Sequence, residues 1–190
     1  GFICVGFFSD VPLGKWMANY HCNATCALPI SHHFLNRMME AKRPGLLAYT
    51  SSSACLFPNP FSSLYASSKA FLTMFACSIA AEVRSLGIDV VVVHPSPMAT
   101  NFFKAGEGLA MLMAFKKLAA GPEVIADVLF STAGRFVVRD QGAVTIFFRL
   151  VLKVLDSVFF AELTSWFAHT TGDYKQFTAQ RAAAAKAKAQ

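Results

Sequence analysis

Short apolar runs alternate with longer segments of helical periodicity along the first three quarters of the chain. Residues 46–50 (LLAYT) and 88–93 (IDVVVV) are nearly continuous apolar runs, as is typical of strands buried on both faces of a parallel sheet. Residues 136–138 (FVV) predict a third, brief strand. Helical segments separate these runs, so the alternation predicts an α/β fold built on a parallel sheet.

The helical segments carry recognisable start and stop signals. In residues 15–42 apolar positions recur at intervals of three and four, and Pro29 should kink or shorten the helix. A second helix should begin after the capping candidates at 62–63 and end at Gly87. A third is expected over residues 121–134, where Gly-Pro-Glu precedes an apolar segment.

The remaining segments are more apolar and less regular. Residues 104–118 predict a loose helical lid with little charge, and residues 142–167 are nearly all apolar. We therefore divide the chain into a part that carries the fold, residues 1–140, an apolar helical extension, 141–178, and a tail, 179–190. The tail is rich in Ala and Lys and is expected to be a solvated helix or disordered.

Composition adds a surplus of apolar surface to this picture. Of the 190 residues, 55% are hydrophobic and 15% charged, where about 25% charged is usual, and the mean hydropathy is +0.45. Such a surplus predicts contact with further parts of the fold, with a partner subunit or with a membrane surface. The net charge of +6 is scattered, which disfavours nucleic acid as a partner and suits an anionic membrane face better.

The five cysteines indicate a reducing environment. Their number is odd, and Cys22 and Cys26 lie four apart in a helical pattern without a second pair at metal-ligand spacing. We expect reduced thiols and no metal site. We also expect an intracellular, reducing location, at the periphery of a membrane such as that of the endoplasmic reticulum or another organelle. The chain opens on Gly1 without a charged leader, so we expect no signal peptide and a native sequence that continues upstream.

Tyr65 and Lys69 form the most suggestive pair for catalysis. They lie four residues apart in the second predicted helix, so both side chains project from one face. A cation beside a phenol lowers the phenol's pKa, which a tyrosine needs in order to exchange protons near neutral pH. Ser52, after the first strand, could hold a substrate oxygen. Taken alone, however, Tyr-x-x-x-Lys more often marks a pair on a helix surface.

The surrounding sequence supplies the context that a lone pair lacks. Residues 50–70 (TSSSACLFPNPFSSLYASSKA) and 94–100 (HPSPMAT) resemble the short-chain dehydrogenase/reductase superfamily, and within it the hydroxysteroid dehydrogenase and 3-ketoacyl reductase branch. The resemblance runs over residues 1–140. It implies a Rossmann-like doubly wound parallel sheet, of which this chain would hold the C-terminal half, about three strands, followed by the apolar helical extension.

The resemblance implies a role for each matching residue. Ser52 would hydrogen-bond the substrate carbonyl or hydroxyl, and Tyr65 would be the general acid/base. Lys69 would lower the pKa of Tyr65 and hold the nicotinamide ribose. Asn23 would position a water in the proton relay, although Asn19 and Asn36 of the same helix are alternatives, and Ser51 and Ser53 flank the serine that the spacing favours.

The loop after the second strand matches the family's nicotinamide loop, usually P-G-x-x-x-T. Ser96 stands where the family has glycine, which puts the backbone geometry of the loop in question. His94, just before it, is expected to be a packing or solvent residue. The expected cofactor contacts come from Tyr65, Lys69, Pro95, Ser96, Met98 and Thr100.

The resemblance also identifies what the chain lacks. No glycine-rich phosphate turn follows a first strand, and Gly1 resembles the last residue of the family's N-N-A-G motif. The residue that selects NAD or NADP would therefore lie upstream, and NADP is favoured by the branch alone. The first hypothesis is accordingly an NAD(P)-dependent oxidoreductase acting on an apolar, steroid- or fatty-acyl-like small molecule.

The alternative hypothesis is a non-catalytic scaffold subunit of a larger, membrane-associated assembly. In either case the resemblance implies a homo-oligomer or larger complex formed through the helices at 15–42 and 62–86, which the family commonly pairs across a two-fold axis. Phe71, Leu72, Phe75 and Ile79 also offer more apolar surface than one sheet face needs. These four residues could equally be ordinary core. Residues 142–167 should rest on a membrane or a hydrophobic partner without crossing, with Arg149, Lys153 and Asp156 on one face of a helix, although a helix packed across the domain is an equal alternative.

Overall fold

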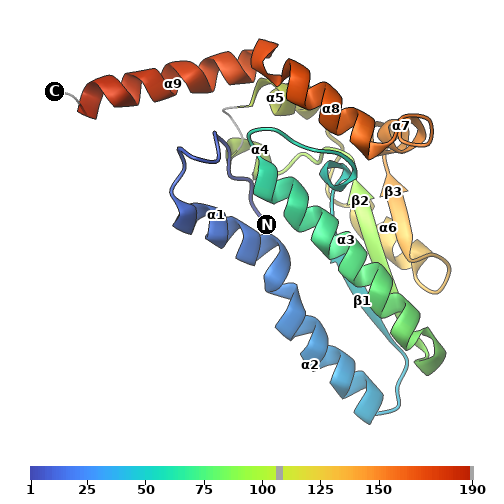
Figure 1. Ribbon diagram of the computed structural model, residues 1–190. Helices are drawn as coiled ribbons and strands as arrows, with labels where there is room; N and C mark the ends of the chain where they lie inside the picture. The colour runs from blue at the N-terminus through green and yellow to red at the C-terminus, as the bar shows by residue number, and fades with distance from the viewer. Residues whose placement is uncertain (106–108, 189–190) are drawn as a thin grey trace.

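Three parallel strands form one sheet in the order β1–β2–β3. The structure is a computed structural model that describes residues 1–105 and 109–188. The strands are β1 (Gly45–Thr50), β2 (Ile88–Pro95) and β3 (Val138–Gln141), and helices connect them (Figure 1). The predicted α/β parallel sheet is confirmed, with the third strand displaced by about two residues toward the C-terminus.

The two predicted buried strands differ in how deeply they are covered. Val91, Val92 and Val93 of β2 are completely buried, because β2 lies between two partner strands. In β1 only Tyr49 is buried, so the prediction of a fully buried strand was wrong there. Among the described residues β1 pairs with β2 alone, which leaves its other edge without a partner strand.

The first predicted helix is interrupted before Pro29. Helix α1 (Leu13–Tyr20) continues into a π-helical turn (His21–Thr25), and α2 (Ala27–Glu40) follows. In the π-helical turn the amide of Cys26 donates to the carbonyl five residues earlier, at 3.0 Å. Pro29 then lies in the first turn of α2, where a missing N–H removes no helical hydrogen bond. The expected break is therefore confirmed.

Helix α3 (Ser63–Val83) is the second predicted helix and covers β2. It continues in a 3₁₀ turn (Arg84–Leu86) and ends at Gly87, whose φ of 73° is the left-handed conformation that favours glycine. Ser62 occupies the N-cap position, but its side chain makes no capping hydrogen bond. By length and composition Ser63–Leu86 could span a membrane; it packs on the sheet, and core helices meet the same criterion.

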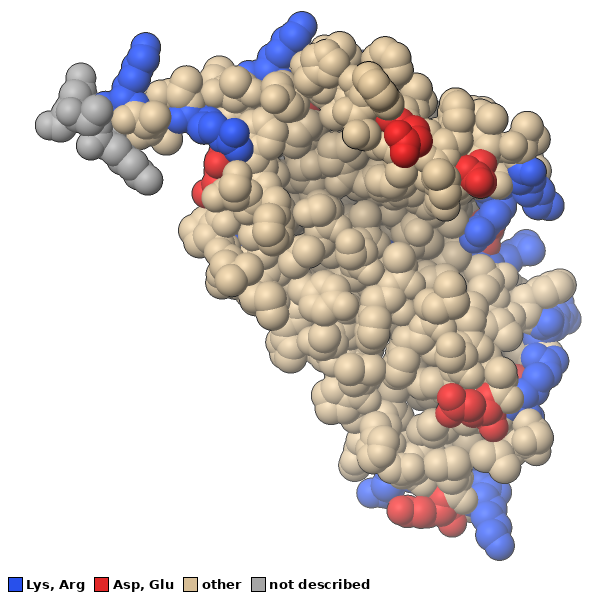
Figure 2. Space-filling model, in the orientation of Figure 1, with Lys and Arg blue, Asp and Glu red and all other residues tan. Residues whose placement is uncertain are grey.

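The apolar residues of α3 divide between core and surface. Leu72 and Ile79 are buried against the sheet, whereas Phe71 and Phe75 are half-buried and stack on each other with ring centroids 5.7 Å apart. Figure 2 shows that the face formed by α1, α2 and α3 carries few charged side chains, most of which lie along its margins. The large apolar side chains exposed on these helices include Leu13, Met17, Ile30, Phe34 and Met74.

Short helices follow β2 and surround the carboxyl end of the sheet. The predicted lid contains α4 (Phe102–Ala105) and α5 (Ala110–Lys116), while its residues 106–108 lie outside the described residues. Helix α6 (Val124–Thr132) leads into β3 and confirms the third predicted helix. The C-terminal helices are α7 (Ala143–Val151), α8 (Ser157–Phe167), a 3₁₀ turn (Ala168–Thr170) and α9 (Gly172–Lys188).

The apolar stretch 142–167 is two helices rather than one. Helix α7 ends at Val151, and the carboxylate of Asp156 caps α8 by accepting a hydrogen bond from the amide of Phe159 at 2.9 Å. Arg149 turns inward and pairs with Asp140 at 2.8 Å. The prediction that Arg149, Lys153 and Asp156 share one helix face was therefore wrong, because Arg149 serves a partly buried ion pair and Asp156 caps the next helix.

Helix α9 extends away from the sheet as a single arm (Figure 1). It includes the Ala/Lys-rich segment, so the tail, which was predicted to be either helical or disordered, is helical as far as Lys188. The boundary proposed between residues 178 and 179 falls inside this helix. Arg181 ties the arm to the N-terminal segment through Asp10, with Nε and Oδ2 2.7 Å apart.

Candidate active site

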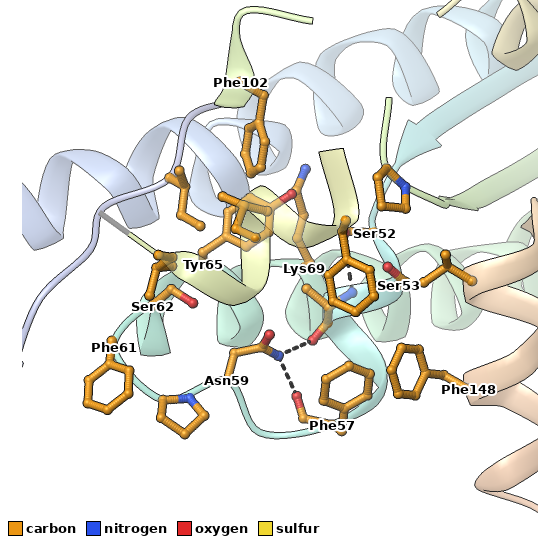
Figure 3. A pocket seen from close by; sticks show the side chains of 18 of the residues that line it. Ser52, Ser53, Phe57, Asn59, Phe61, Ser62, Tyr65, Lys69, Phe102 and Phe148 are labelled. Atoms are coloured by element: carbon orange, nitrogen blue, oxygen red, sulfur yellow. Dashed lines mark hydrogen bonds between the residues drawn. The ribbon is translucent and has the colours of Figure 1, made fainter. Parts of the chain in front are cut away.

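The carboxyl ends of β1 and β2 and the first turns of α3 meet at one edge of the sheet. Ser52 follows β1, Tyr65 and Lys69 lie one turn apart on α3, and Pro95 ends β2. All four line one cavity of about 920 Å³, and Figure 3 shows Ser52, Tyr65 and Lys69 around it. Ligands of open parallel sheets bind at this edge. The structure thus brings the predicted Ser-Tyr-Lys set together.

Ser52 is the serine of its cluster whose side chain faces Tyr65. Its hydroxyl contacts the Tyr65 hydroxyl and accepts a hydrogen bond from the amide of Ala54 at 3.2 Å, which caps a 3₁₀ turn (Ser53–Leu56). Ser51 is buried, and its hydroxyl donates to the Lys69 carbonyl oxygen at 2.8 Å. Ser51 therefore joins β1 to α3, and Ser52 is the one placed for substrate.

Lys69 and Tyr65 do not interact as the sequence suggested. The Lys69 ammonium donates to the Thr50 carbonyl oxygen at 2.9 Å and lies 5.9 Å from the centroid of the Tyr65 ring. Burial raises the pKa of Tyr65 to about 12, against the opposing effect of the hydrogen bond with Ser52. We expected Lys69 to lower this pKa; in the structure desolvation outweighs other effects, and Tyr65 is a protonated phenol.

Asn23 lies beside Lys69, behind the first residue of the chain. Its Oδ1 accepts from the Phe2 amide at 3.0 Å and its Nδ2 donates to the Phe2 carbonyl at 2.7 Å. A Cβ added to Gly1 would meet Asn23 Oδ1 and would lie 3.9 Å from Lys69 Nζ. Gly1 lines the cavity, whereas Asn23 stands one layer behind it. Asn23 belongs to the π-helical turn, and such turns frequently mark functional sites.

The other two asparagines of this helical segment have different surroundings. Asn19 is completely buried; its Nδ2 donates to the Phe2 carbonyl at 2.6 Å, while its Oδ1 has no hydrogen-bond partner among the described residues. Asn36 contacts the ring of His32 one turn earlier on α2, at 3.4 Å. The geometry thus favours Asn23 over Asn36, while the proposed water-positioning role of Asn23 stays a prediction.

Ser96, which replaces the family's glycine, lines the cavity and engages its side chain with α7. Its hydroxyl accepts from the Thr145 amide at 3.0 Å and lies 3.1 Å from Thr145 Oγ1, so it caps the first turn of α7. Its own amide donates to the Gln141 carbonyl at 2.8 Å. The substitution therefore anchors α7 to the loop, and any cofactor contact of Ser96 would come from its backbone.

The rest of the predicted nicotinamide loop borders the cavity. Met98 and Thr100 line it, as does Pro97. The loop is fixed by its pairing with Ala120, whose carbonyl accepts from the Ala99 amide at 2.8 Å and whose amide donates to the Pro97 carbonyl at 3.1 Å. Because these hydrogen bonds hold the loop, its backbone can face a bound nicotinamide ring in a single conformation.

His94 was the residue that sequence reasoning misjudged. It is completely buried, with Nδ1 2.8 Å from Asp140 Oδ1 and Nε2 3.0 Å from Thr73 Oγ1. The available signal was three ionisable residues, His94, Asp140 and Arg149, set within apolar segments. Their distance along the chain gave no indication that they would meet.

Aromatic side chains form the wall of the cavity opposite the sheet. Phe57 lies 4.6 Å from Phe148 of α7 and 6.1 Å from Phe160 of α8, measured between ring centroids. Phe115 of the predicted lid also lines the cavity. The sequence pointed to the lid alone, so the contribution of α7 and α8 was missed. The side chains of this wall are apolar, as is typical of sites that bind apolar ligands.

The family model of short chain dehydrogenases matches residues 1–109. The chain belongs to the short-chain dehydrogenase family. It is 38% identical over 84 residues to 17-beta-hydroxysteroid dehydrogenase type 3 of Mus musculus, covering 44% of this chain and 27% of that relative. It is 35% identical over 102 residues to the very-long-chain 3-oxoacyl-CoA reductase of Anas platyrhynchos, covering 52% and 32%. These relatives confirm the predicted branch of this short-chain dehydrogenase.

Solved structures confirm the fold of this short-chain dehydrogenase. A short-chain dehydrogenase from Streptomyces avermitilis superposes with a TM-score of 0.68 at 22% identity, over 90% of this chain and 67% of that one. The chain spans only about a third of the curated relatives it matches, 27% and 32% of their lengths. The activity of the whole protein is therefore a matter for proposal.

The donor groups of this short-chain dehydrogenase fit one end of the nicotinamide cofactor that the family implies. Lys69 and Tyr65 line the cavity beside Gly1, where any larger residue would strike Asn23. The loop at 95–100 borders the same space at the carboxyl end of β2. A glycine-rich phosphate turn is not found in the sequence between a strand and a helix. Tyr65, Lys69 and the loop at 95–100 would hold the nicotinamide and its ribose.

Proposed function

We propose that the protein is an NAD(P)-dependent oxidoreductase that moves a hydride to or from the carbonyl or hydroxyl carbon of an apolar substrate. The observation that carries the proposal is the joint placement of Ser52, Tyr65 and Lys69 on one apolar cavity. We propose NADP before NAD as the cofactor, on the ground of the branch to which the relatives belong. When bound, the nicotinamide supplies or accepts the hydride.

The residues of this chain supply the proton and hold the substrate oxygen. In the direction of reduction, the Tyr65 phenol donates its proton to the substrate oxygen, and the Ser52 hydroxyl hydrogen-bonds the same oxygen. A pKa of about 12 keeps Tyr65 in the protonated form that reduction requires, while it also makes the proton harder to release. Lys69 stabilises the phenolate that remains, because its ammonium lies on the same helix face one turn away.

The proposed substrate is an apolar molecule with one carbonyl or hydroxyl group. Support comes from the aromatic wall and from the cavity volume of about 920 Å³, near the upper end of the range of roughly 300–1,000 Å³ for small-molecule sites. The two relatives above are named for a hydroxysteroid and a very-long-chain 3-oxoacyl-CoA. We propose a steroid- or fatty-acyl-like substrate on both grounds.

The scaffold hypothesis is not proposed further. A site filled by another chain's side chains would favour the scaffold, whereas a groove lined by Ser52, Tyr65 and Thr100 favours the enzyme, and such a groove is present. We keep the proposals of a homo-oligomer, of contact with a membrane surface and of an intracellular, reducing location. The last is supported by five free cysteines among the described residues.

The test is turnover by the whole protein with NADH or NADPH and a set of apolar ketones. Tyr65→Phe should abolish it, with a loss of about a thousandfold, because only the transferable proton is removed. Cofactor binding, followed by fluorescence titration, should be largely retained. Tyr20→Phe, which also removes a phenolic hydroxyl, is the matched control. A Tyr65→Phe protein that keeps about a tenth or more of wild-type activity contradicts the role of Tyr65.

A further inference from the structure

A chain of polar side chains runs from α7 to the catalytic helix behind the cavity. Arg149 forms two hydrogen bonds with Asp140 at the end of β3, Nε to Oδ2 at 2.8 Å and Nη2 to Oδ1 at 3.1 Å. Asp140 in turn lies 2.8 Å from His94 Nδ1, and His94 Nε2 lies 3.0 Å from Thr73 Oγ1. We call Arg149, Asp140, His94 and Thr73 the His94 network.

The His94 network ends on the backbone of the catalytic lysine. Thr73, one turn after Lys69 on α3, has its Oγ1 2.9 Å from the Lys69 carbonyl oxygen and 2.8 Å from Ser51 Oγ. Ser51 donates to the same carbonyl at 2.8 Å and immediately precedes Ser52. A shift of His94 would therefore move Lys69 and Ser52 relative to each other, although His94 itself does not line the cavity.

The ionic state of His94 follows from its neighbours. Asp140 Oδ1 accepts a hydrogen bond from His94 Nδ1; Arg149 Nη2 lies 3.0 Å from the same nitrogen but, being only a donor, is bonded to Asp140 Oδ1 at 3.1 Å. We assign the proton to Nδ1, because the carboxylate stabilises an imidazolium. Burial alone would lower the pKa of His94, but the hydrogen bonds with Asp140 and Cys55 raise it to about 9. Burial would raise the pKa of Asp140, but His94 and Arg149 hold it well below its usual range.

Protonated His94 fixes the direction of the hydrogen bonds that follow. With Nε2 protonated, the ring donates to Thr73 Oγ1, and the Thr73 proton is then available to the Lys69 carbonyl or to Ser51. Cys55, from the 3₁₀ turn after Ser52, is the remaining titratable group facing the ring; burial alone would raise the pKa of its thiol, but His94 lowers it. Side chains from α3, β3, α7 and the 3₁₀ turn after Ser52 thus meet at this histidine.

We propose that His94 is a positioning residue of the active site, which aligns Lys69 and Ser52 through Thr73 and Ser51 and is itself held by Asp140 and Arg149. The inference rests on the proposed oxidoreductase function. Its structural half, a charged His94 bound to Asp140, can be measured without turnover, so the two proposals fail in different ways.

Thr73→Val cuts the network beside Lys69 while preserving the shape of the side chain. In the whole protein kcat should fall about tenfold and KM should change by less than about twofold, because alignment is lost and substrate contacts are kept. Thr73→Ser restores the hydroxyl and should remain within about twofold of wild type. Thr132→Val on α6 is the matched control, since the Thr132 hydroxyl, like that of Thr73, donates to the backbone carbonyl one turn earlier, here that of Val128.

The dependence of stability on pH gives a second readout. Because folding raises the pKa of His94 from 6.5 to about 9, its stabilising contribution is complete below pH 6.5 and is lost as the pH rises through about 9. The free energy of unfolding should fall across this interval, and Asp140→Asn should flatten the fall.

The outcomes separate the two proposals. If the wild-type protein shows no turnover with either cofactor, the proposed function fails and the pH profile still tests the network. If the wild type is active and Thr73→Val behaves like Thr132→Val, the positioning role is overturned. An unchanged pH profile in Asp140→Asn overturns the charged state of His94.

Discussion

Two regions of the molecule face each other across the cavity and are held in place differently. Residues 45–95 carry Ser52, Tyr65 and Lys69 and are supported by β2, whose central valines are completely buried. Residues 143–167 form the opposite wall, and there Val154 is 84% and Trp166 71% exposed. The first region has a buried apolar core, whereas α7 of the second region is attached through the directional contacts of Thr145 and Arg149 as well as through aromatic packing.

The difference shows how the family fold can combine fixed chemistry with an adjustable binding wall. Helix α7 buries Thr145, which is bonded to Ser96, and pairs Arg149 with Asp140. The contacts of Thr145 and Arg149 fix one edge of this helix. Val144 and Phe148 of the same helix line the cavity and make none of these polar contacts. Catalytic groups need placement within fractions of an ångström, and regular buried elements provide it better than surface helices.

Lys69→Met should have the largest effect among the tests of this comparison. In the catalytic region the loss of the ammonium should lower kcat/KM by about a hundredfold or more and weaken cofactor binding, because the proposed mechanism uses Lys69 for both. Lys153→Met, an exposed lysine of the opposite region, is the control and should leave both quantities unchanged. Steady-state kinetics and cofactor titration on the whole protein measure the two effects; equal behaviour of the variants would refute the division of roles.

The catalytic region was also the part that sequence patterns predicted well. A run of valines, a glycine stop and an i to i+4 pair are local signals, so β2, α3 and the placement of Tyr65 beside Lys69 could be read directly. The other region depends on contacts between distant segments. Nothing local indicates that Arg149 turns inward to Asp140 or that Ser96 caps α7. The break between α7 and α8 did have a local signal, the N-cap residue Asp156, which was overlooked.

The pKa of Tyr65 could not be predicted either. The spacing to Lys69 is local, but desolvation depends on everything packed around the hydroxyl. In the structure this packing outweighs the expected effect of the cation, and the pKa rises to about 12. Sequence identifies which groups meet, whereas the balance of their effects needs the fold.

The outer face of α2 and α3 tests whether the catalytic region also forms a subunit interface. Phe34 and Met74 are 56% and 69% exposed, on the face that Figure 2 shows to be poor in charge. The double variant Phe34→Glu/Met74→Glu should raise the dimer Kd by about thirtyfold, since charges would have to be buried in the contact. Sedimentation velocity on the whole protein measures this. Trp166→Glu is the control, and a wild type that is monomeric at micromolar concentration removes the claim.

Phe148→Ala probes the adjustable wall. Phe148 packs on Phe57 in the cavity and makes no hydrogen bond to the catalytic set, so its removal should enlarge the site without disturbing the chemistry. We expect the ratio of kcat/KM for longer over shorter apolar ketones to rise about tenfold. Phe147→Ala, one position away and 60% exposed, should leave the ratio as it is. A uniform loss for all ketones in Phe148→Ala would instead indicate that the wall supports the catalytic groups.

The smallest expected effect concerns the outer surface of α7 and α8. These helices contain 9 and 11 residues, too short to cross a bilayer, which takes about 20, so we propose that they lie in the plane of the membrane surface. Because Arg149 pairs inward, their outer face carries less charge than the sequence suggested. Exposed apolar residues of α7, α8 and the segment between them include Ile146, Phe147, Leu150, Val154, Val158, Phe159 and Trp166.

Phe147→Glu and Trp166→Glu should each weaken binding of the whole protein to phosphatidylcholine–phosphatidylserine vesicles about threefold, since each places a carboxylate in the apolar contact. Point variants are preferable to deletion of residues 142–190, because deletion would also remove Thr145 and Arg149, which anchor Ser96 and Asp140. Met74→Glu places the same charge on the opposite region and serves as the control in a vesicle co-flotation assay. If all three variants float like the wild type, or if the wild type does not float, this surface is not a membrane contact, and the exposed side of the adjustable wall needs another partner.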